Sequence, residues 1–546
     1  SNFGSRYSGI VPLSRMPTCS IGRMLPARYG VVGHACAALL DCFAQCSSIS
    51  RTMQRIDKSS VLLCFCAGLA VLTLGGCAFR GLLERIVASI KMMPPTAKQL
   101  KEEALEANPL YRWIPAMRGK LAWRSLGKFP TPVHRFRVPL GATAEGRSSG
   151  NEVEFWVKRE DLCSETYGGN KVRTLQYSLA SFEAHVEKCK TNACTSRPRL
   201  LTLGSPGSNQ IIATKLYAAS LGLSDDCIEG YTPIPDDPEM DNTLNYLSSL
   251  SLPGKQFRLG HLRLCAAALR RSSGSGGEAA AWILPPGGNN VAGVLGQVGA
   301  AIELAEQIVR GELPDPDGIV VALGSACTTT GLVLGVALAR HLGMLAFQKP
   351  GFRIYAQPVH PGAIYLQRFF GMVRSESFPL MVGRGLRDAA AAIVGSGGPD
   401  VTAEALVVMR TELEVSTDTS ICGGYGAHSK VSLEAKIAYD FSRPVDEVPG
   451  LWMCGHFTGK SFALLLKLLR EDIAQQRENR VLVFWQTKSA VQPLGSKDEW
   501  GAFKKECATS SAVKKWGVLG GISGHPGAPA SLVDAKPTPA EGPEQY

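Results

Sequence analysis

The sequence contains no C-x-x-C pair, although 16 cysteines are scattered along its 546 residues. This absence argues against a designed disulfide framework and favours a mostly reduced compartment. The sequence also has no arginine-rich helix and no alternation of aromatic and basic residues. Its formal net charge of +11 therefore predicts a mildly basic, solvated surface, and we expect no nucleic-acid partner. With 45% hydrophobic and only 19% charged residues, the bulk of the chain is expected to be globular, with more than one domain.

Acidic residues are scarce near the N-terminus, where residues 1–91 contain ten Arg or Lys but only three Asp or Glu. That balance is typical of an organellar targeting segment. Val61 to Phe79 is a run of nineteen uncharged residues, just long enough to cross a bilayer, with basic residues on both sides. Residues 1–92 are interpreted as a membrane anchor first, a cleaved targeting segment second and untranslated sequence third. The first two interpretations imply a membrane-anchored, mitochondrial or other organellar protein. The third implies a cytoplasmic one that starts at Met53 or Met92.

The rest of the sequence alternates helical and strand patterns, which predicts an α/β fold. Strands are expected at Val133–Val138, Glu154–Lys158, Leu200–Leu203, Ile319–Leu323 and Val481–Trp485. Helices are expected at Leu100–Asn108, after Lys171, at Asn209–Gly222 with Ile212, Leu216 and Ala219 on one side, at Val298–Val309 and at Leu332–His341. Segments outside regular structure are predicted as a hairpin tip at Gly141–Gly150, insertions at Glu187–Arg199 and Ser272–Gly277, and a mostly disordered tail at 490–546.

The most informative stretch is Val157 to Tyr177. In it, Gly168 and Gly169 allow close backbone approach or a positive φ, and Lys171 follows directly before an apolar helical stripe. A lysine at such a position can be partly desolvated, which lowers its pKa and frees the amine to form a Schiff base with an aldehyde. The alternative is a surface lysine that merely opens a helix.

Two other segments have a strand, a glycine turn and a helix in succession. After the first strand, Ser208 and Asn209 stand at the start of a helix, either as an ordinary N-cap or as site residues. After the second, Gly324 to Gly331 has small residues whose N–H groups can converge on an anion. This turn lacks the G-K-[ST] of a P-loop and the spacing of G-x-G-x-x-G. Its predicted phosphate-binding residues are Gly324, Ser325, Ala326, Cys327 and Thr328.

The residues KRED...GGNK-R-L-Y from Lys158 to Tyr177 resemble the pyridoxal-phosphate enzymes of the 1-aminocyclopropane-1-carboxylate (ACC) deaminase and D-cysteine desulfhydrase family. The resemblance continues through most of Phe129 to Thr487, roughly two-thirds of the chain. It implies the tryptophan-synthase-β-like fold (fold type II), an α/β fold with two open-sheet domains and pyridoxal 5'-phosphate between them. The family's connectivity would put 172–295 in a smaller domain and 93–171 with 296–489 in a larger, cofactor-binding one. A homodimer is implied as well.

The resemblance also implies roles for individual residues. In the family the lysine of GGNK carries the cofactor, which corresponds to Lys171. The serine of a G-x-x-S-N-x element lies beside the substrate and its asparagine bonds the cofactor's phenolic oxygen, here Ser208 and Asn209. The tyrosine of GYG faces the substrate, here Tyr425. Thr458 stands where the partner of the pyridine nitrogen belongs, and the loop Pro285 to Asn290 is expected to border the substrate pocket.

The sequence departs from the family pattern at three places. Cys327 replaces the second glycine of the phosphate loop G-S-x-G-T, which is tolerable only if Cys327 need not adopt a positive φ. Phe457 replaces an expected tyrosine, so that one hydroxyl is missing. Gln486-Thr487-Lys488-Ser489 stands where the family usually has H-T-G-G.

The resemblance implies a lyase or deaminase that acts on a small amino acid, and no metal site is predicted. Opening the ACC ring needs a strong electron sink, best served by a carboxylate that keeps the pyridine nitrogen protonated, and Thr458 cannot take that role. Eliminating a thiolate from D-cysteine is less demanding. D-Cysteine desulfhydrase is therefore preferred, with pyruvate, sulfide and ammonia as products. The alternatives are an ACC deaminase, an enzyme for another amino acid, and a cofactor-binding protein without turnover.

Overall fold

The structure is a computed structural model that describes residues 91–493 with gaps, the longer ones at 142–151, 234–244, 260–266, 272–279 and 361–381; residues 425 and 456 are also outside the description. The predictions for the N-terminal segment, including Val61 to Phe79, lie outside the described residues. So do most of the hairpin tip, the insertion at Ser272–Gly277 and the C-terminal tail. Within the described ranges, every helix is too short or too polar to cross a bilayer.

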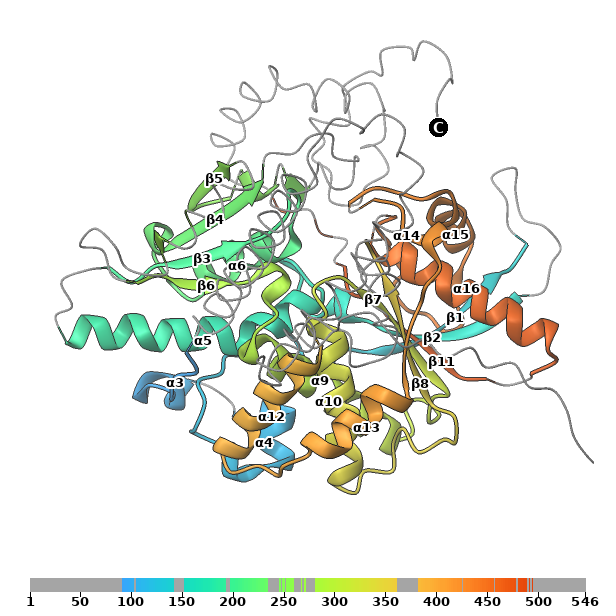
Figure 1. Cartoon of the computed structure of the whole chain (residues 1–546), viewed down its shortest axis with the longest axis horizontal. Helices are drawn as coiled ribbons and strands as arrows, with labels where there is room; N and C mark the ends of the chain where they lie inside the picture. The colour runs from blue at the N-terminus through green and yellow to red at the C-terminus, as the bar shows by residue number, and fades with distance from the viewer. Residues whose placement is uncertain are drawn as a thin grey trace, which may run out of the picture. The chain divides into compact units, whose positions relative to one another are not determined.

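The described strands form two open sheets (Figure 1). The larger has the order β10-β1-β2-β11-β7-β8-β9 and the smaller the order β5-β4-β3-β6. The strands of the larger sheet are β1 (Val133–Pro139), β2 (Glu152–Lys158), β7 (Gly318–Leu323), β8 (Arg353–Pro358), β9 (Leu413–Val415), β10 (Arg443–Pro444) and β11 (Leu482–Trp485). Those of the smaller are β3 (Leu200–Leu203), β4 (Ile228–Pro233), β5 (Lys255–Leu259) and β6 (Trp282–Leu284). Neighbours from β2 to β9, and all those of the smaller sheet, run parallel. The five predicted strands and the two-sheet α/β fold are thereby confirmed.

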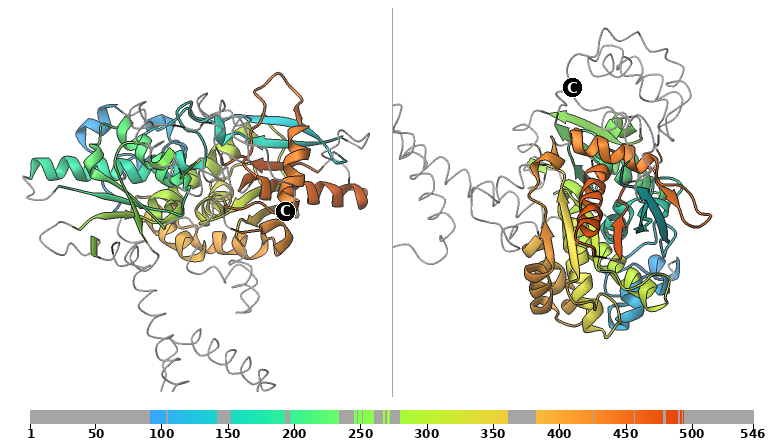
Figure 2. Two further views of the ribbon diagram at one scale, coloured as in Figure 1. Left: turned by 90° about the horizontal axis from the view of Figure 1, so that it is seen from above. Right: turned by 90° about the vertical axis from the view of Figure 1, so that its right-hand side faces the viewer.

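Strand β7 shows why the larger sheet is covered on both faces. Its successive side chains point to opposite sides, so that Ile319 and Val321 join one buried cluster and Val320 joins another. The first cluster contains residues of α9, α10, α12 and α13, and the second contains residues of α15 and α16. The two groups of helices are visible in Figures 1 and 2. A strand buried on both faces is typical of a parallel sheet.

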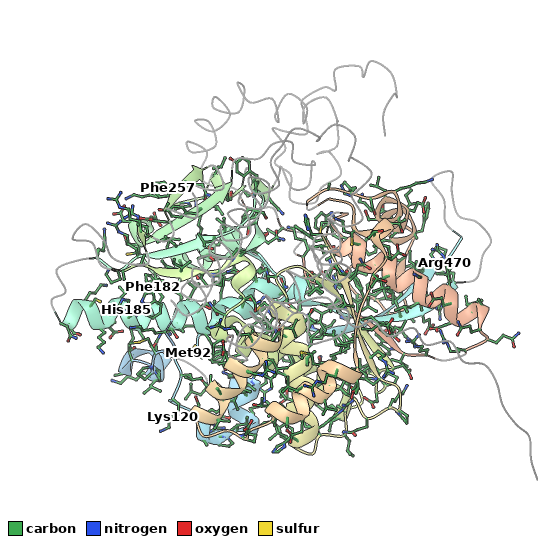
Figure 3. The ribbon with its side chains drawn as sticks, in the orientation of Figure 1. Met92, Lys120, Phe182, His185, Phe257 and Arg470 are labelled. Carbon is green, nitrogen blue, oxygen red and sulfur yellow. The ribbon has the colours of Figure 1, made fainter. Side chains whose placement is uncertain are left out.

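The helices confirm most of the predicted pattern. They are α3 (Ala97–Glu102), α4 (Pro109–Trp113), α5 (Asn170–Thr191), α6 (Asn209–Ser220), α9 (Val291–Val309), α10 (Cys327–His341), α12 (Arg384–Gly395), α13 (Thr402–Thr411), α14 (Thr419–Cys422), α15 (Lys430–Asp440) and α16 (Thr458–Ala474). The apolar stripe on α5 is buried from Val172 to Phe182, where Phe182 packs edge-on against Trp282 of β6 at 5.8 Å between ring centroids. Figure 3 shows Phe182 with His185 on this helix.

Several predicted boundaries were wrong. Helix α9 begins at Val291 rather than Val298, because the Asn290 side chain accepts a capping bond from the Gly293 amide at 2.8 Å. Helix α5 continues to Thr191, so that Glu187–Thr191 is its polar last turn and not an insertion. The range Leu100–Asn108 is divided between the end of α3 and a short 3₁₀ turn.

The three residues predicted to lie on one side of α6 differ in their burial. Ala219 is exposed, whereas Ile212 is fully buried and Leu216 partly so. The first part of α6 is buried on all sides, from Gln210 to Lys215, and the last buried residues are Tyr217 and Ala218.

Glycines let α9 pass unusually close to its two neighbouring helices. A Cβ added to Gly296 would lie 1.9 Å from the Arg173 carbonyl oxygen of α5. On α10, a Cβ on Gly331 would lie 2.2 Å from the Gln297 Cβ, and one on Gly335 would lie 2.4 Å from the Ala301 Cβ. The three helices that start at or beside the site described below are thus packed backbone to backbone.

A buried ionic cluster joins these helices to β2. Lys158 of β2 donates to Glu303 of α9 at 2.7 Å, and Arg173 of α5 binds both Glu303 and Glu160 at 2.7 and 2.8 Å. The Thr131 amide also donates to Glu303 at 2.8 Å. All four charged side chains are at most 2% exposed, and their charges balance, as burial requires.

Candidate active site

The segment before Lys171 requires both of its glycines. A Cβ on Gly168 would lie 2.0 Å from the Asp161 carbonyl oxygen, and Gly169 has a φ of 104°. The first is a close backbone approach and the second a left-handed conformation, the two reasons for which glycine was expected here. Lys171 follows as the second residue of α5.

Asn170 is held by three different parts of the fold. Its side-chain amide donates to the Thr328 hydroxyl of α10 at 2.8 Å, and its carbonyl accepts from the Gln297 amide of α9 at 2.7 Å. Its backbone N–H donates to the Thr487 carbonyl at 3.1 Å, just beyond β11. These bonds fix the first turn of α5 and hence the origin of the Lys171 side chain.

The Lys171 amine lies in a half-buried position and donates to the Gly287 carbonyl at 3.2 Å. Burial lowers the pKa of Lys171 below its ordinary value, while its electrostatic interaction with Cys327 acts in the opposite direction. A larger fraction of the amine is therefore neutral, and nucleophilic, near neutral pH than for an exposed lysine.

The turn before α10 adopts the geometry of an anion site. Ala326, and not Cys327, takes the positive φ of 68°, and Cys327 is the first residue of the helix. The condition for tolerating cysteine at this position is therefore met. The predicted helix start at Leu332 was wrong, because the first helical turn is formed by the small residues Cys327 to Thr330. Their leading N–H groups have no partner within the helix and carry the positive end of its dipole.

The Lys171 amine and this turn lie together. Asn289 donates to the Ser325 carbonyl at 2.7 Å, and the Cys327 thiol donates to the Gly288 carbonyl at 3.5 Å. An added Cβ on Gly287 would meet the Ser325 Oγ at 2.2 Å and the Lys171 Nζ at 3.6 Å. The loop before α9 thus separates the lysine from the turn by the thickness of one backbone segment.

The other predicted residues are placed as follows. Ser208 occupies the N-cap position of α6, but its side chain makes no capping hydrogen bond, so the ordinary-cap interpretation does not account for its hydroxyl. The Asn209 Oδ1 accepts hydrogen bonds from the Tyr167 hydroxyl at 2.7 Å and the Asn245 amide at 2.9 Å. Tyr167 lies four residues before Lys171, so that these bonds tie the start of α6 to the start of α5.

Thr458 begins α16 and is fully buried. Its hydroxyl accepts from the Cys454 amide and donates to the Cys454 carbonyl, both at 3.1 Å. The Thr458 hydroxyl also lies 3.2 Å from the Cys454 thiol. Tyr425 lies outside the described residues, and its role stays a prediction.

Sequence reasoning missed three side chains around the site. Tyr167 and Lys488 contact each other, with the lysine amine 3.5 Å from the tyrosine hydroxyl, and Glu303 anchors the helix that carries Lys171. Glu303 lies within a largely apolar helix whose other acid is Glu306, and an acid in such a run is a signal for a buried partner. The only sequence signal for Lys488 was that it stands in the segment that departs from the H-T-G-G pattern.

The residues fit a cofactor that combines an aldehyde with a phosphate. A lysine of lowered pKa lies beside a turn that offers backbone N–H groups, and the nearby Thr329 hydroxyl is buried without a hydrogen-bond partner in the described part of the chain. Gly324 is exposed and Ser325 half-buried, which leaves the mouth of the turn accessible. Backbone donors at a helix N-terminus suit a phosphate.

The Gly287 geometry makes a testable prediction. A Gly287→Ala variant would place a methyl group against the Ser325 Oγ at a φ of +67°. We expect the affinity for pyridoxal phosphate to fall about tenfold or more, because the clash displaces the turn that is expected to hold the phosphate. Equilibrium titration monitored by absorbance measures this.

The matched control for that experiment is Gly311→Ala. Gly311 also has a positive φ, of +76°, but a Cβ there would have no atom within 4 Å. It shares the backbone strain without the contact, so its affinity should be unchanged. Equal losses in both variants would show that Gly287 matters only for stability.

Comparisons with known proteins show what this chain is similar to. No protein-family model matches the chain. Over 245 residues the chain is 29% identical to the mitochondrial bifunctional D-cysteine desulfhydrase/ACC deaminase of Arabidopsis thaliana, a match that covers 43% of this chain and 55% of that protein. It is 30% identical over 197 residues to the D-cysteine desulfhydrase of Serratia proteamaculans, covering 34% and 53%. The chain thus spans about half the length of the curated relatives it matches.

Among solved structures, an ACC deaminase homologue matches 71% of this chain and 98% of its own, with a TM-score of 0.46 and 20% identity. Apo diaminopropionate ammonia lyase of Escherichia coli matches 77% and 94%, with a TM-score of 0.38 and 10% identity. Neither TM-score reaches 0.5, so the assignment rests on sequence. A lysine beside a phosphate-type turn defines a pyridoxal-phosphate class of site. Within that class, the chain is similar in sequence to ACC deaminases and D-cysteine desulfhydrases.

Proposed function

We propose that this protein is a pyridoxal-phosphate-dependent lyase that converts D-cysteine to pyruvate, sulfide and ammonia. The observation that carries the proposal is the position of the Lys171 amine, which bonds the Gly287 carbonyl within the same group of loops as Ser325 and Cys327. A nucleophilic amine and an anion site at this separation suit one molecule that has an aldehyde and a phosphate.

The residues that would hold the cofactor come from three loops. Lys171 would bind its aldehyde carbon, and the turn from Gly324 to Thr328 its phosphate. Asn209 would donate its Nδ2 to the phenolic oxygen, because its Oδ1 is already engaged by two donors. When bound, pyridoxal phosphate supplies an electron sink for the α-carbon of an amino acid.

The chain's own contribution to the reaction is proton transfer and orientation. With pyridoxal phosphate bound, the Lys171 Nζ would take the α-proton of D-cysteine. The Cβ–S bond then breaks, and the electron pair leaves with sulfur, which is protonated to hydrogen sulfide. The remaining 2-aminoacrylate takes up water to give pyruvate and ammonia. Ser208, whose hydroxyl is not used as a helix cap, is proposed to lie beside the substrate.

Thr458 is the reason for preferring D-cysteine over ACC. Its hydroxyl is neutral and already bonded to the Cys454 backbone, so it cannot stabilise a protonated pyridine as a carboxylate would. ACC has no α-proton, and opening its ring depends most on that protonation. Loss of a thiolate depends on it less.

The test is a product assay of the purified chain with D-cysteine, L-cysteine and ACC in parallel. We expect sulfide, pyruvate and ammonia in equal amounts from D-cysteine, and at least tenfold less turnover of the other two, which corresponds to about 1.4 kcal/mol of transition-state discrimination. Dominant formation of 2-oxobutanoate from ACC would instead establish an ACC deaminase. Cofactor absorbance without any product would establish a binding protein without turnover, which the departures at Cys327, Phe457 and Gln486 make a real alternative.

The assembly and the compartment are proposed from the resemblance to the same family. A homodimer is expected, which light scattering of the purified chain would measure. The Arabidopsis relative is named as mitochondrial. Together with the basic, acid-poor composition of residues 1–91, this supports a targeting role for that segment, which a fluorescent-protein fusion would test.

A further inference from the structure

Lys488 is a buried cation beside the candidate site. It lies three residues beyond β11, is only 3% exposed, and forms an isolated β-bridge with Gly169, two residues before Lys171. Its amine lies 5.1 Å from the centroid of the Tyr167 ring and 5.5 Å from that of Trp452. Two aromatic faces thus stabilise a charge that is otherwise costly to bury.

The Lys488 amine begins a short chain of hydrogen bonds. It donates to the Tyr167 hydroxyl at 3.5 Å, and this hydroxyl donates to the Asn209 Oδ1 at 2.7 Å. Asn245 donates to the same oxygen at 2.9 Å. Since both donors meet Oδ1, the Asn209 Nδ2 points away from them, on the other side of Cγ, and can act as a donor.

Hydrogen bonds arranged head to tail polarise one another, and a cation at the start of the chain increases the effect. The positive charge of Lys488 draws electron density from the Tyr167 hydroxyl and makes it a stronger donor to Asn209. The Asn209 Nδ2 in turn becomes a stronger donor to an oxygen that carries negative charge.

We propose that Lys488 is a positioning residue that acts through Tyr167 and Asn209 to stabilise the negative charge on the cofactor's phenolic oxygen. The inference rests on the proposed function, and it deepens that function by assigning a regulator of the cofactor's protonation. A positive charge favours the less positive state of a titrating neighbour. Lys488 thereby lowers the pH at which the bound cofactor loses its proton.

Other titratable groups face the same region. Those around Tyr167 and Lys171 are Tyr217 on α6, Cys454 before α16 and Cys327 on α10. Burial raises the pKa of Tyr167 well above its usual range and that of Cys327 to about 11. These two groups therefore stay neutral near pH 7, where the charge of Lys488 acts on the hydrogen bonds through Tyr167 to Asn209.

The test compares the pH dependence of the visible absorbance of the cofactor-loaded protein in the wild type, Lys488→Met, Lys488→Arg and Tyr167→Phe. In Lys488→Met, the midpoint pH of the absorbance titration is expected to rise by about one pH unit. The affinity for pyridoxal phosphate is expected to fall about tenfold. Lys488→Arg keeps the charge and should restore most of both. Tyr167→Phe removes the hydroxyl that links Lys488 to Asn209 and leaves the lysine in place. It should shift the midpoint in the same direction.

In the double variant Lys488→Met/Tyr167→Phe, the midpoint should shift no further than in the single variant with the larger shift. The reason is that the two residues act through the same series of hydrogen bonds. Lys467→Met, which removes a half-exposed lysine paired with Asp418, is the control for net charge and should leave the midpoint unchanged. An unchanged midpoint in a folded Lys488→Met protein would overturn the inference while the proposed function stands. If the wild type shows no Lys171-dependent absorbance at all, the proposed function itself fails.

Discussion

A Lys171→Ala variant is expected to lose turnover by about 10³-fold or more and to lose the visible absorbance of covalently bound cofactor. Both effects have one cause, since the amine that binds the aldehyde is also the base that takes the α-proton. The side chain is half-buried and bonds only a loop carbonyl among its described hydrogen bonds, so that its removal should leave the fold intact. Steady-state sulfide release and an absorbance spectrum measure the two losses.

The control for Lys171→Ala is Lys467→Ala, which removes a half-exposed lysine that pairs with Asp418 at 3.3 Å. It should retain full activity and absorbance. A Lys171→Ala protein with wild-type turnover would refute the whole mechanism, whatever the substrate. Reduction of the loaded wild type with borohydride, followed by peptide mapping, should place the cofactor on Lys171.

Removing Glu303 is expected to have the largest effect on stability. In Glu303→Ala, Lys158 and Arg173 would lose the carboxylate that both contact at 2.7 Å, and the Thr131 amide would lose its acceptor. Breaking a buried ion pair on one side costs about 3–5 kcal/mol. Chemical denaturation of the wild type and the variant measures the difference in the free energy of unfolding.

The matched control is Glu404→Ala on α13, whose carboxylate is half-exposed and lies 3.3 Å from His341. An exposed pair of this kind contributes about 0–1 kcal/mol, so that the control should unfold near the wild-type midpoint. Similar losses of unfolding free energy in the two variants would show that the buried cluster contributes no more to stability than an exposed ion pair.

The same carboxylate predicts a pH dependence. Burial by itself would raise the pKa of Glu303, but Arg173 and Lys158 outweigh it and lower the pKa from 4.5 to about 2. A group whose pKa is lowered on folding stabilises the folded state fully above its unfolded pKa, and the contribution disappears as the pH falls. The wild type should therefore lose stability between about pH 4.5 and pH 2, and Glu303→Ala should lose less over that interval. A parallel loss in both proteins would contradict the assignment.

Local sequence patterns were sufficient for much of the fold. The β-branched run at Ile319–Leu323 and the short apolar run at Leu200–Leu203 predicted strands within one residue, because a parallel strand buried on both faces leaves little freedom in composition. The start of α10 was missed because Cys327 to Thr330 have neither apolar periodicity nor high helix propensity. Packing against α9 and the left-handed Ala326 determine that start instead.

The sequence by itself determined the chemistry that the chain could offer: a lysine after two glycines, a small-residue turn after a central strand, and a serine and asparagine at a helix start. These are properties of single segments, and each depends on neighbours within a few residues. Only the tertiary structure decided that the Lys171 amine faces Gly287, that Cys327 escapes the positive φ, and that Lys488 reaches Tyr167 from more than three hundred positions away along the chain. Such contacts are set by the close passage of α5, α9 and α10 and by the bonds that hold Asn170, which no local pattern encodes.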